Sequence, residues 1–265
     1  GEYIEAAGFV PDGVCLMLTS VDFVLSHPGP GEFALPQDFC ARDGHDRNPQ
    51  RSRQEWTSGQ LRELIAQLHA RGSQAFLTVF TRFYGNRYHP EWLGEHPETF
   101  QVFRGLGPAH SVNCLSRLSG GSYFEDYFIA KLVETLGDYG FDGWHGADGW
   151  GPLSGAIYRT SIGDDMVGQF AERTGLALPE LVTRPCDADV EALEARIQWL
   201  WRNARHEWIE FWCGRWEQFW TKALDALHAD GKQAFINSAW GRAPWESLYR
   251  YGVDERRIEA AGVDG

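Results

Sequence analysis

The sequence predicts an α/β fold in which helices cover a parallel sheet, and three observations carry this prediction. Apolar, partly β-branched runs alternate along the chain with segments that have the apolar spacing of amphipathic helices. Connections from a helix to the next strand are tight, whereas connections from a strand to the next helix are long. The length of 265 residues suits one large domain over 1–265. Such alternation implies parallel strands, with helices on both faces or a closed barrel.

Two strand–helix units are expected in the N-terminal half. The run 14–24 is apolar and has the length of a buried strand. Residues 56–70 predict a helix, because their aliphatic side chains fall on one face and Gly72 follows as a stop signal. The next strand is predicted over 74–84, and a second long loop over 85–121.

The second half repeats this rhythm. Residues 122–139 predict a helix, because phenylalanines and leucines recur at helical spacing and Gly140 closes it. A strand is then expected over 141–146. A helical region follows over 187–230, with a break inside it because about 40 residues is long for a globular helix. The fourth strand is predicted over 232–240.

The last residues open one more unit. Residues 256–261 predict a short helix, and the sequence "AGVDG" then begins what should be another strand, where the chain ends. Fewer strands can be counted than an eight-stranded barrel needs. We therefore expect either a fragment of a longer chain or a barrel whose remaining strands are absent.

A stripe of tryptophans runs along the long helical region, since spacings of four and seven residues keep to one side of a helix. We interpret the stripe as packing against the sheet, and an assembly interface is the alternative. Its members are Trp201, Trp208, Trp212, Trp216 and Trp220.

Composition excludes several classes of function. The net charge of −13 argues against nucleic acid and against an anionic membrane surface. The chain contains no run of about 18 apolar residues and shows no signal peptide, so a cytoplasmic location is expected, with a processed secreted chain as the alternative. Five widely spaced cysteines without a CxxC pair are expected to be reduced and mostly buried. Twelve tryptophans suit a carbohydrate site, where sugar C–H faces stack on rings.

Candidate site residues follow from topology, because ligands bind at the carboxyl ends of parallel strands. Acids, one imidazole, an amide and aromatic rings follow the four predicted strands, which is the set that glycosidic bond cleavage needs. The candidate catalytic acids are Asp148 and Glu246. The candidate substrate-binding residues are Asp22, Arg82, Tyr84, His145, Trp150, Asn237 and Trp240.

The stretch "GFDGWHGAD", with "LIAQLHARGSQAFLTVF" and "ALDALHADGKQAFINSAW", resembles (β/α)8-barrel glycoside hydrolases whose nucleophile follows strand four, such as the α-amylase, α-galactosidase and dextranase-like families. The resemblance covers most of the chain in rhythm and about ten residues in motif. It implies a TIM-barrel type fold, complete or partial, and a retaining mechanism. Asp148 is implied as the nucleophile, Asp142 as scaffold and His145 as a ligand of a sugar hydroxyl. Glu246, or an acid beyond Gly265, is implied as the acid/base.

Three alternatives to a glycosidase stay open. A non-catalytic carbohydrate-binding barrel would keep the aromatic rim without a second carboxylate. A metal-dependent hydrolase would use His27, Asp43, His45 and Asp46. A structural or assembly protein would use the tryptophan stripe as its interface. The principal interpretation needs no metal and no cofactor, and its partner is an oligosaccharide or glycoside.

Overall fold

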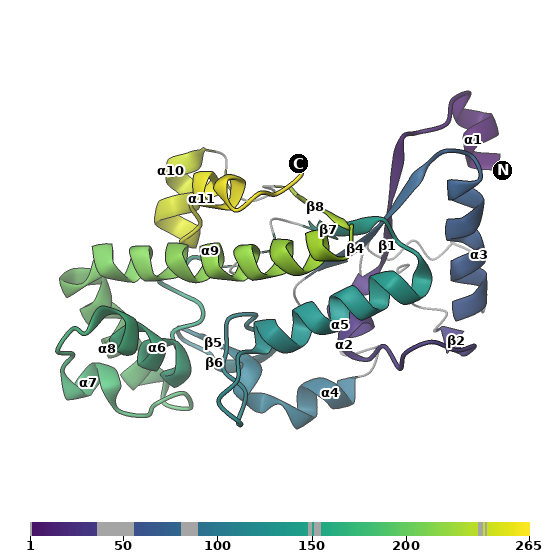
Figure 1. The fold of residues 1–265 in the computed structure, drawn as a ribbon. Coiled ribbons are helices and arrows are strands. Elements are labelled where there is room, and N and C mark those ends of the chain that lie inside the picture. The colour runs from purple at the N-terminus through teal and green to yellow at the C-terminus, as the bar shows by residue number, and fades with distance from the viewer. Residues whose placement is uncertain are drawn as a thin grey trace.

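The computed structural model confirms a mixed α/β fold with a four-stranded parallel sheet (Figure 1). It describes residues 2–35, 56–80, 90–147, 150, 155–237, 241 and 243–265. The strands of the sheet are β1 (Gly13–Ser20), β4 (Gln74–Phe80), β7 (Gly143–Gly146) and β8 (Gln233–Ile236), side by side in that order.

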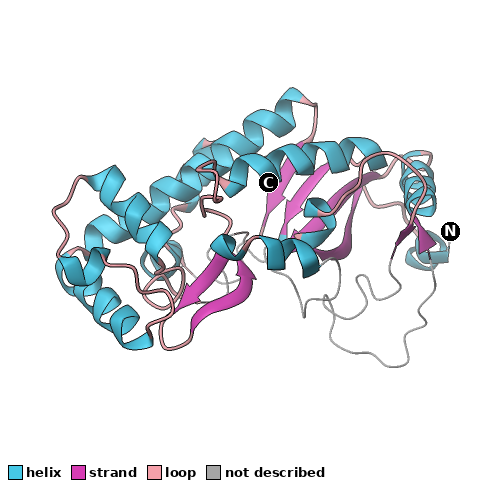
Figure 2. Cartoon of the chain, turned by 90° about the horizontal axis from the view of Figure 1, so that it is seen from below, coloured by secondary structure: helices cyan, strands magenta, loops and turns pink. Residues whose placement is uncertain are grey.

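The sheet winds in one direction, because each strand lies beside the next one along the chain. The helices α3 (Ser58–His69), α5 (Phe124–Tyr139) and α9 (Arg205–Ala229) connect them. The helix α5 contacts both α3 and α9, and α5 and α9 run along one face of the sheet (Figures 1 and 2). In the described part of the chain, the strand order shows no reversal of the kind that marks a doubly wound sheet.

Local signals in the sequence set the helix ends. Thr57 caps α3 in a capping box with Gln60, whose side chain accepts a hydrogen bond from the Thr57 backbone. Gly140 ends α5 with a φ of 82°, a left-handed conformation that glycine adopts without steric cost. The predicted long helical region breaks at Ala204 into α8 (Val190–Asn203) and α9.

A His–Asp arrangement occurs twice at the amino ends of the strands. Asp142 Oδ2 accepts a hydrogen bond from Ala75 N at 2.7 Å and lies 2.7 Å from His69 Nε2. Asp264 Oδ2 accepts from Ala234 N at 2.8 Å. It also lies 3.1 Å from the His228 ring at the end of α9. Asp142 is therefore part of the scaffold, as the resemblance implied.

The predicted opening of a further strand has structural support at the end of the chain. Asp264 N donates to Ala234 O at 3.0 Å, and Ile236 N donates to Gly265 O at 2.9 Å. Residues 264–265 thus bond along the free side of β8.

Glycines and phenylalanines alternate on the sheet face opposite the helices. The rings of Phe76 on β4 and Phe235 on β8 meet edge to face with centroids 4.9 Å apart. A Cβ at Gly13 would lie 2.9 Å from the Phe76 ring, and one at Gly265 would lie 2.7 Å from the Phe235 ring. A side chain at either glycine would displace the neighbouring ring, because the ring fills the space that the side chain would take.

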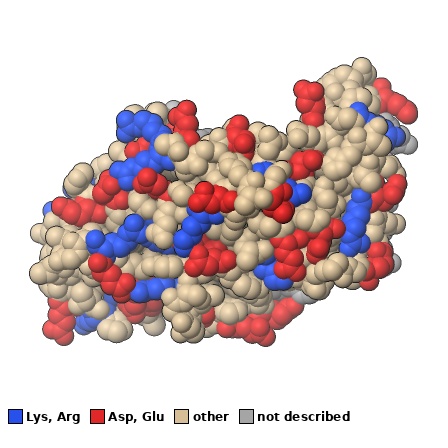
Figure 3. Space-filling model, viewed as in Figure 1, with Lys and Arg blue, Asp and Glu red and all other residues tan. Residues whose placement is uncertain are grey.

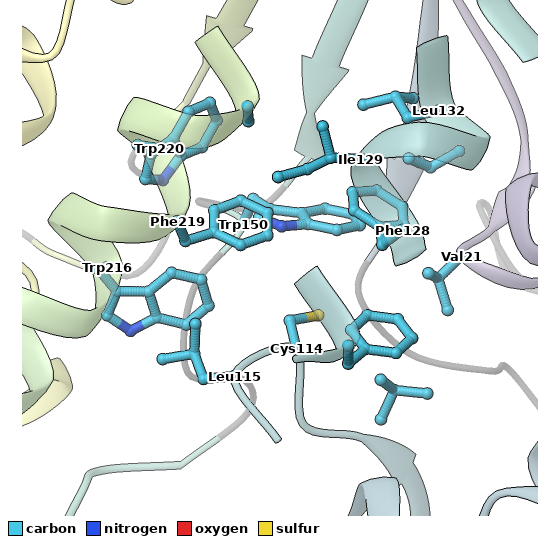
Figure 4. Close-up of a cluster of buried hydrophobic side chains, with 14 of the residues drawn as sticks. Val21, Cys114, Leu115, Phe128, Ile129, Leu132, Trp150, Trp216, Phe219 and Trp220 are labelled. Carbon is cyan, nitrogen blue, oxygen red and sulfur yellow. The ribbon is translucent and has the colours of Figure 1, made fainter. Parts of the chain in front are cut away.

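The tryptophan stripe packs inward, as predicted. Figure 4 shows Trp216, Phe219 and Trp220 of α9 facing the core beside Trp150 and Phe128. Trp208, Trp212, Trp216 and Trp220 are buried, whereas Trp201 at the end of α8 is half-buried. Cys114, Cys186 and Cys213 are buried free thiols, as predicted, while the free thiol of Cys15 is exposed.

One strand prediction and one loop prediction need correction. Residues 22–24 were predicted as the end of a strand, but they belong to the helical turn α2 (Asp22–Leu25), in which Asp22 accepts a hydrogen bond from Phe23 N. The predicted loop 85–121 contains α4 (Pro90–Glu95), η1 (Pro97–Thr99) and the hairpin of β5 (Phe100–Phe103) with β6 (Gly107–Val112). Gly105 and Gly107 take up the positive φ values at the hairpin turn.

Smaller elements complete the described chain. They are α1 (Glu2–Ala7), β2 (Ala34–Leu35), β3 (Trp56–Thr57), α6 (Asp164–Thr174), α7 (Glu180–Thr183), α10 (Pro244–Glu246), η3 (Ser247–Tyr251) and α11 (Glu255–Ala260).

None of the helices in the described ranges combines the length and apolar character that crossing a bilayer needs. On the face seen in Figure 3, basic and acidic side chains are interspersed.

Candidate functional site at the carboxyl edge of the sheet

Three neighbouring strands place one row of polar side chains toward the carboxyl edge of the sheet. Thr78 on β4 pairs in register with His145 on β7, and Asn237 directly follows β8. Thr78 Oγ1 lies 3.2 Å from His145 Nδ1, and His145 Nε2 lies 2.9 Å from Asn237 Oδ1. His145 and Asn237 were both predicted to bind substrate, and the structure brings them into direct contact.

The contacts fix the orientation of the imidazole. An amide oxygen can only accept a hydrogen bond, so His145 Nε2 carries the proton that Asn237 Oδ1 receives. In the neutral ring, Nδ1 then accepts the hydrogen of the Thr78 hydroxyl. These two neighbours contact both nitrogens of the His145 ring. We therefore expect His145 to position Asn237, and its predicted contact with a sugar hydroxyl stays a prediction.

The row has the connectivity of a nucleophile, a base and an orienting group, but burial assigns Thr78 a different role. The Thr78 side chain is buried, with 2% of its surface exposed, and it lies inside β4. A nucleophile needs contact with the substrate, so we interpret Thr78 as the residue that orients His145. Sequence reasoning missed Thr78, because the strand was predicted over 74–84, which places residue 78 near its middle.

Asp22 is an acid close to the carboxyl end of the first strand. Residue 22 follows β1, and its carboxyl group is buried, with Oδ1 accepting a hydrogen bond from Phe23 N at 3.1 Å. Strands in a sheet lie about 4.8 Å apart, so the edge from β1 to β8 is about 14 Å wide. That width accommodates one or two sugar rings.

Of the two remaining described candidates, one belongs to the core and the other lies on the short helix that follows β8 along the chain. The Trp150 ring is 1% exposed and stacks on Phe128 with centroids 4.9 Å apart, so it belongs to the core and we leave it out of the site (Figure 4). Glu246 lies on α10, where its carboxylate pairs with Arg250 at 3.2 Å. The η3 segment that continues α10 packs against α9.

Four candidates lie outside the described residues, and the structure therefore does not test them. These are Asp148, Arg82, Tyr84 and Trp240. In the sequence, Asp148 stands two positions after the last residue of β7.

Two aspartates, Asp164 and Asp187, interact with each other away from this edge. Asp187 Oδ1 accepts a hydrogen bond from Asp164 N at 2.7 Å, at the first residue of α6. Burial raises the pKa of Asp187 to about 6, and the nearby Asp164 carboxylate adds to the increase. The buried Arg196 guanidinium binds Asp164 at 2.7 Å. This pair joins α6 to α8 and is structural.

Comparisons with known proteins leave the family open. No known family model matches the chain, and no curated protein matches it.

Proposed function

We propose that this chain binds glycosides at the carboxyl edge of its sheet and hydrolyses a glycosidic bond there. The observation that carries the proposal is the hydrogen-bonded row of Thr78, His145 and Asn237 across three parallel strands. Polar groups held in this way at the ligand-binding edge of an α/β sheet fit the hydroxyl-rich surface of a sugar.

The same proposal includes a (β/α)8 barrel as the parent fold. Sequential strand order and helices that contact one another support it. The alternation of glycine with phenylalanine on the opposite face also supports it, because barrel interiors are filled in layers by side chains from alternate strands. The proposal also includes a cytoplasmic location, which rests on the sequence alone.

The proposed mechanism is a retaining double displacement. Asp148 attacks the anomeric carbon, and a carboxylic acid, for which Glu246 is the candidate, protonates the leaving oxygen. The same carboxylate then removes a proton from the water that releases the sugar. Asn237 binds a substrate hydroxyl, His145 holds the Asn237 side chain in place, and Asp22 supplies a further acceptor near β1.

The test is release of 4-nitrophenolate from a panel of aryl glycosides. We expect wild type to hydrolyse at least one glycoside and Asp148→Asn to lose turnover. Asp142→Asn is the matched control, because Asp142 lies six residues away in the same stretch but at the amino edge. Equal activity of wild type and Asp148→Asn would refute the catalytic assignment.

A non-catalytic carbohydrate-binding protein is the second candidate. The described carboxylates favour it, since Glu246 pairs with Arg250 and Asp22 is buried, so neither is shown as a second catalytic acid. Binding of a glycoside without hydrolysis, unchanged in Asp148→Asn, would support this candidate over the enzyme.

A further inference from the structure

A group of three potential metal ligands lies between the segment after α2 and the helix α5. His27, Glu134 and Asp138 each present a donor atom, and these atoms lie within 4.8 Å of one another. Within the described ranges, no other group of three His, Cys, Asp or Glu side chains converges in this way. From this geometry we propose that the group binds a divalent transition-metal ion of the Zn²⁺ class.

The donor set suits that ion. Zn²⁺ takes imidazole nitrogen and carboxylate oxygen at about 2.0–2.2 Å in tetrahedral sites, which sets neighbouring ligand atoms about 3.3 Å apart. His27 Nε2 lies 2.7 Å from Asp138 Oδ2, so these two atoms must separate by roughly 0.6 Å to admit the ion. Three protein ligands leave a fourth position for water.

The fold holds the three residues in place. Glu134 and Asp138 are four residues apart on α5, so their side chains project from one face of the helix. The His27 side chain is almost fully buried and its ring lies 5.3 Å from the Tyr139 ring, which limits its freedom. A bound ion would tie the segment after α2 to α5.

Lys131 competes with the proposed ion. Its ammonium group donates to Glu134 Oε2 at 2.8 Å and to His27 O at 3.2 Å, so a positive charge already stands beside two of the ligands. Removal of that charge in Lys131→Met should tighten Zn²⁺ binding by roughly tenfold, because repulsion between the ammonium and the divalent ion disappears.

His27 also belonged to the predicted metal site with Asp43, His45 and Asp46. Those three positions lie outside the described residues. The structure gives His27 two other carboxylate neighbours, Asp138 and Glu134. His45→Ala therefore separates the two assignments, because only the predicted site would lose its ion.

The experiment measures the thermal midpoint of the full chain with and without Zn²⁺ at pH 7.5, and the Co²⁺ absorption spectrum. Saturating Zn²⁺ should raise the midpoint of wild type by roughly 5 °C. Glu134→Gln should lose most of this shift, and so should His27→Ala. The Glu134 side chain is 40% exposed, so its variant keeps the fold even if His27→Ala does not.

His69→Ala is the matched control. His69 and Asp142 form an equally short pair at 2.7 Å, but no third donor among the described residues joins them. The proposal predicts that His69→Ala and His45→Ala keep the Zn²⁺ shift. An absent shift in wild type, or an unchanged shift in Glu134→Gln, would overturn it.

Discussion

The buried ion pair between Glu125 and Arg215 allows a quantitative test of how α5 and α9 are joined. Both side chains are fully buried, and Arg215 Nη2 donates to Glu125 Oε2 at 2.7 Å. Lys222 donates to the other carboxylate oxygen at 2.8 Å. Glu125→Gln removes the negative charge and leaves the Arg215 guanidinium in the core with only neutral partners, such as Gln169.

Loss of one partner from a buried pair costs about 3–5 kcal/mol, and we expect this full value because neither group reaches solvent. Lys222 adds little, since its side chain is one-third exposed and its ammonium keeps Asp126 as a partner. An unfolding entropy of about 0.6 kcal/mol/K for 265 residues converts the loss into a midpoint decrease of about 5–9 °C.

Urea unfolding followed by tryptophan fluorescence measures the loss. The double variant Glu125→Leu with Arg215→Met should recover most of the stability, because the desolvation cost of both charges disappears. A loss below about 1 kcal/mol for Glu125→Gln, or a double variant less stable than the single one, would refute the reasoning.

Three further predictions concern packing, pH and the scaffold. Trp150→Ala should destabilise the chain by about 3–5 kcal/mol in urea unfolding, because it opens a cavity beside Phe128 and Phe219. Trp150→Phe should leave glycoside binding unchanged, because the ring belongs to the core. Burial raises the pKa of Asp187 from 3.8 to about 6, so its contribution to stability is present below pH 4 and is lost as the pH rises through 6. Asp187→Asn should therefore gain about 1 kcal/mol relative to wild type between pH 4 and pH 8, a reduced value because the side chain is 38% exposed. Asp142→Ala should lose about 1–3 kcal/mol by leaving Ala75 N without its acceptor, and turnover on aryl glycosides should not change.

The sequence predicted the parallel sheet, the main helices and their glycine stops, because hydrophobic periodicity and local capping decide these features. It missed the hairpin of β5 and β6, whose six-residue second strand "GPAHSV" has no apolar alternation. It placed Trp150 at the site because residue 150 follows a strand, although the side chain turns back into the core.

The site could be predicted only in part. The proximity of His145 and Asn237 could be predicted because the carboxyl-edge rule needs strand order alone, and parallel strands bring their ends together. Their role in substrate binding stays a prediction. The Thr78 contact depends on which residues face each other across β4 and β7, and strand register is set by tertiary packing rather than by either strand alone.

The proposed carboxyl-edge site is tested most directly by calorimetric titration of a glycoside, chosen from the hydrolysis panel, into Asn237→Ala and Gln74→Ala, both in the Asp148→Asn background. Gln74 is the matched control, because it is an exposed amide that bonds to β8 through Gln233, at the opposite edge of the sheet. We expect Asn237→Ala to weaken binding about tenfold, the loss of one well-placed hydrogen bond, and Gln74→Ala to bind like the background variant. Unchanged binding by Asn237→Ala, or an equal loss in both variants, would contradict a glycoside site at the carboxyl edge.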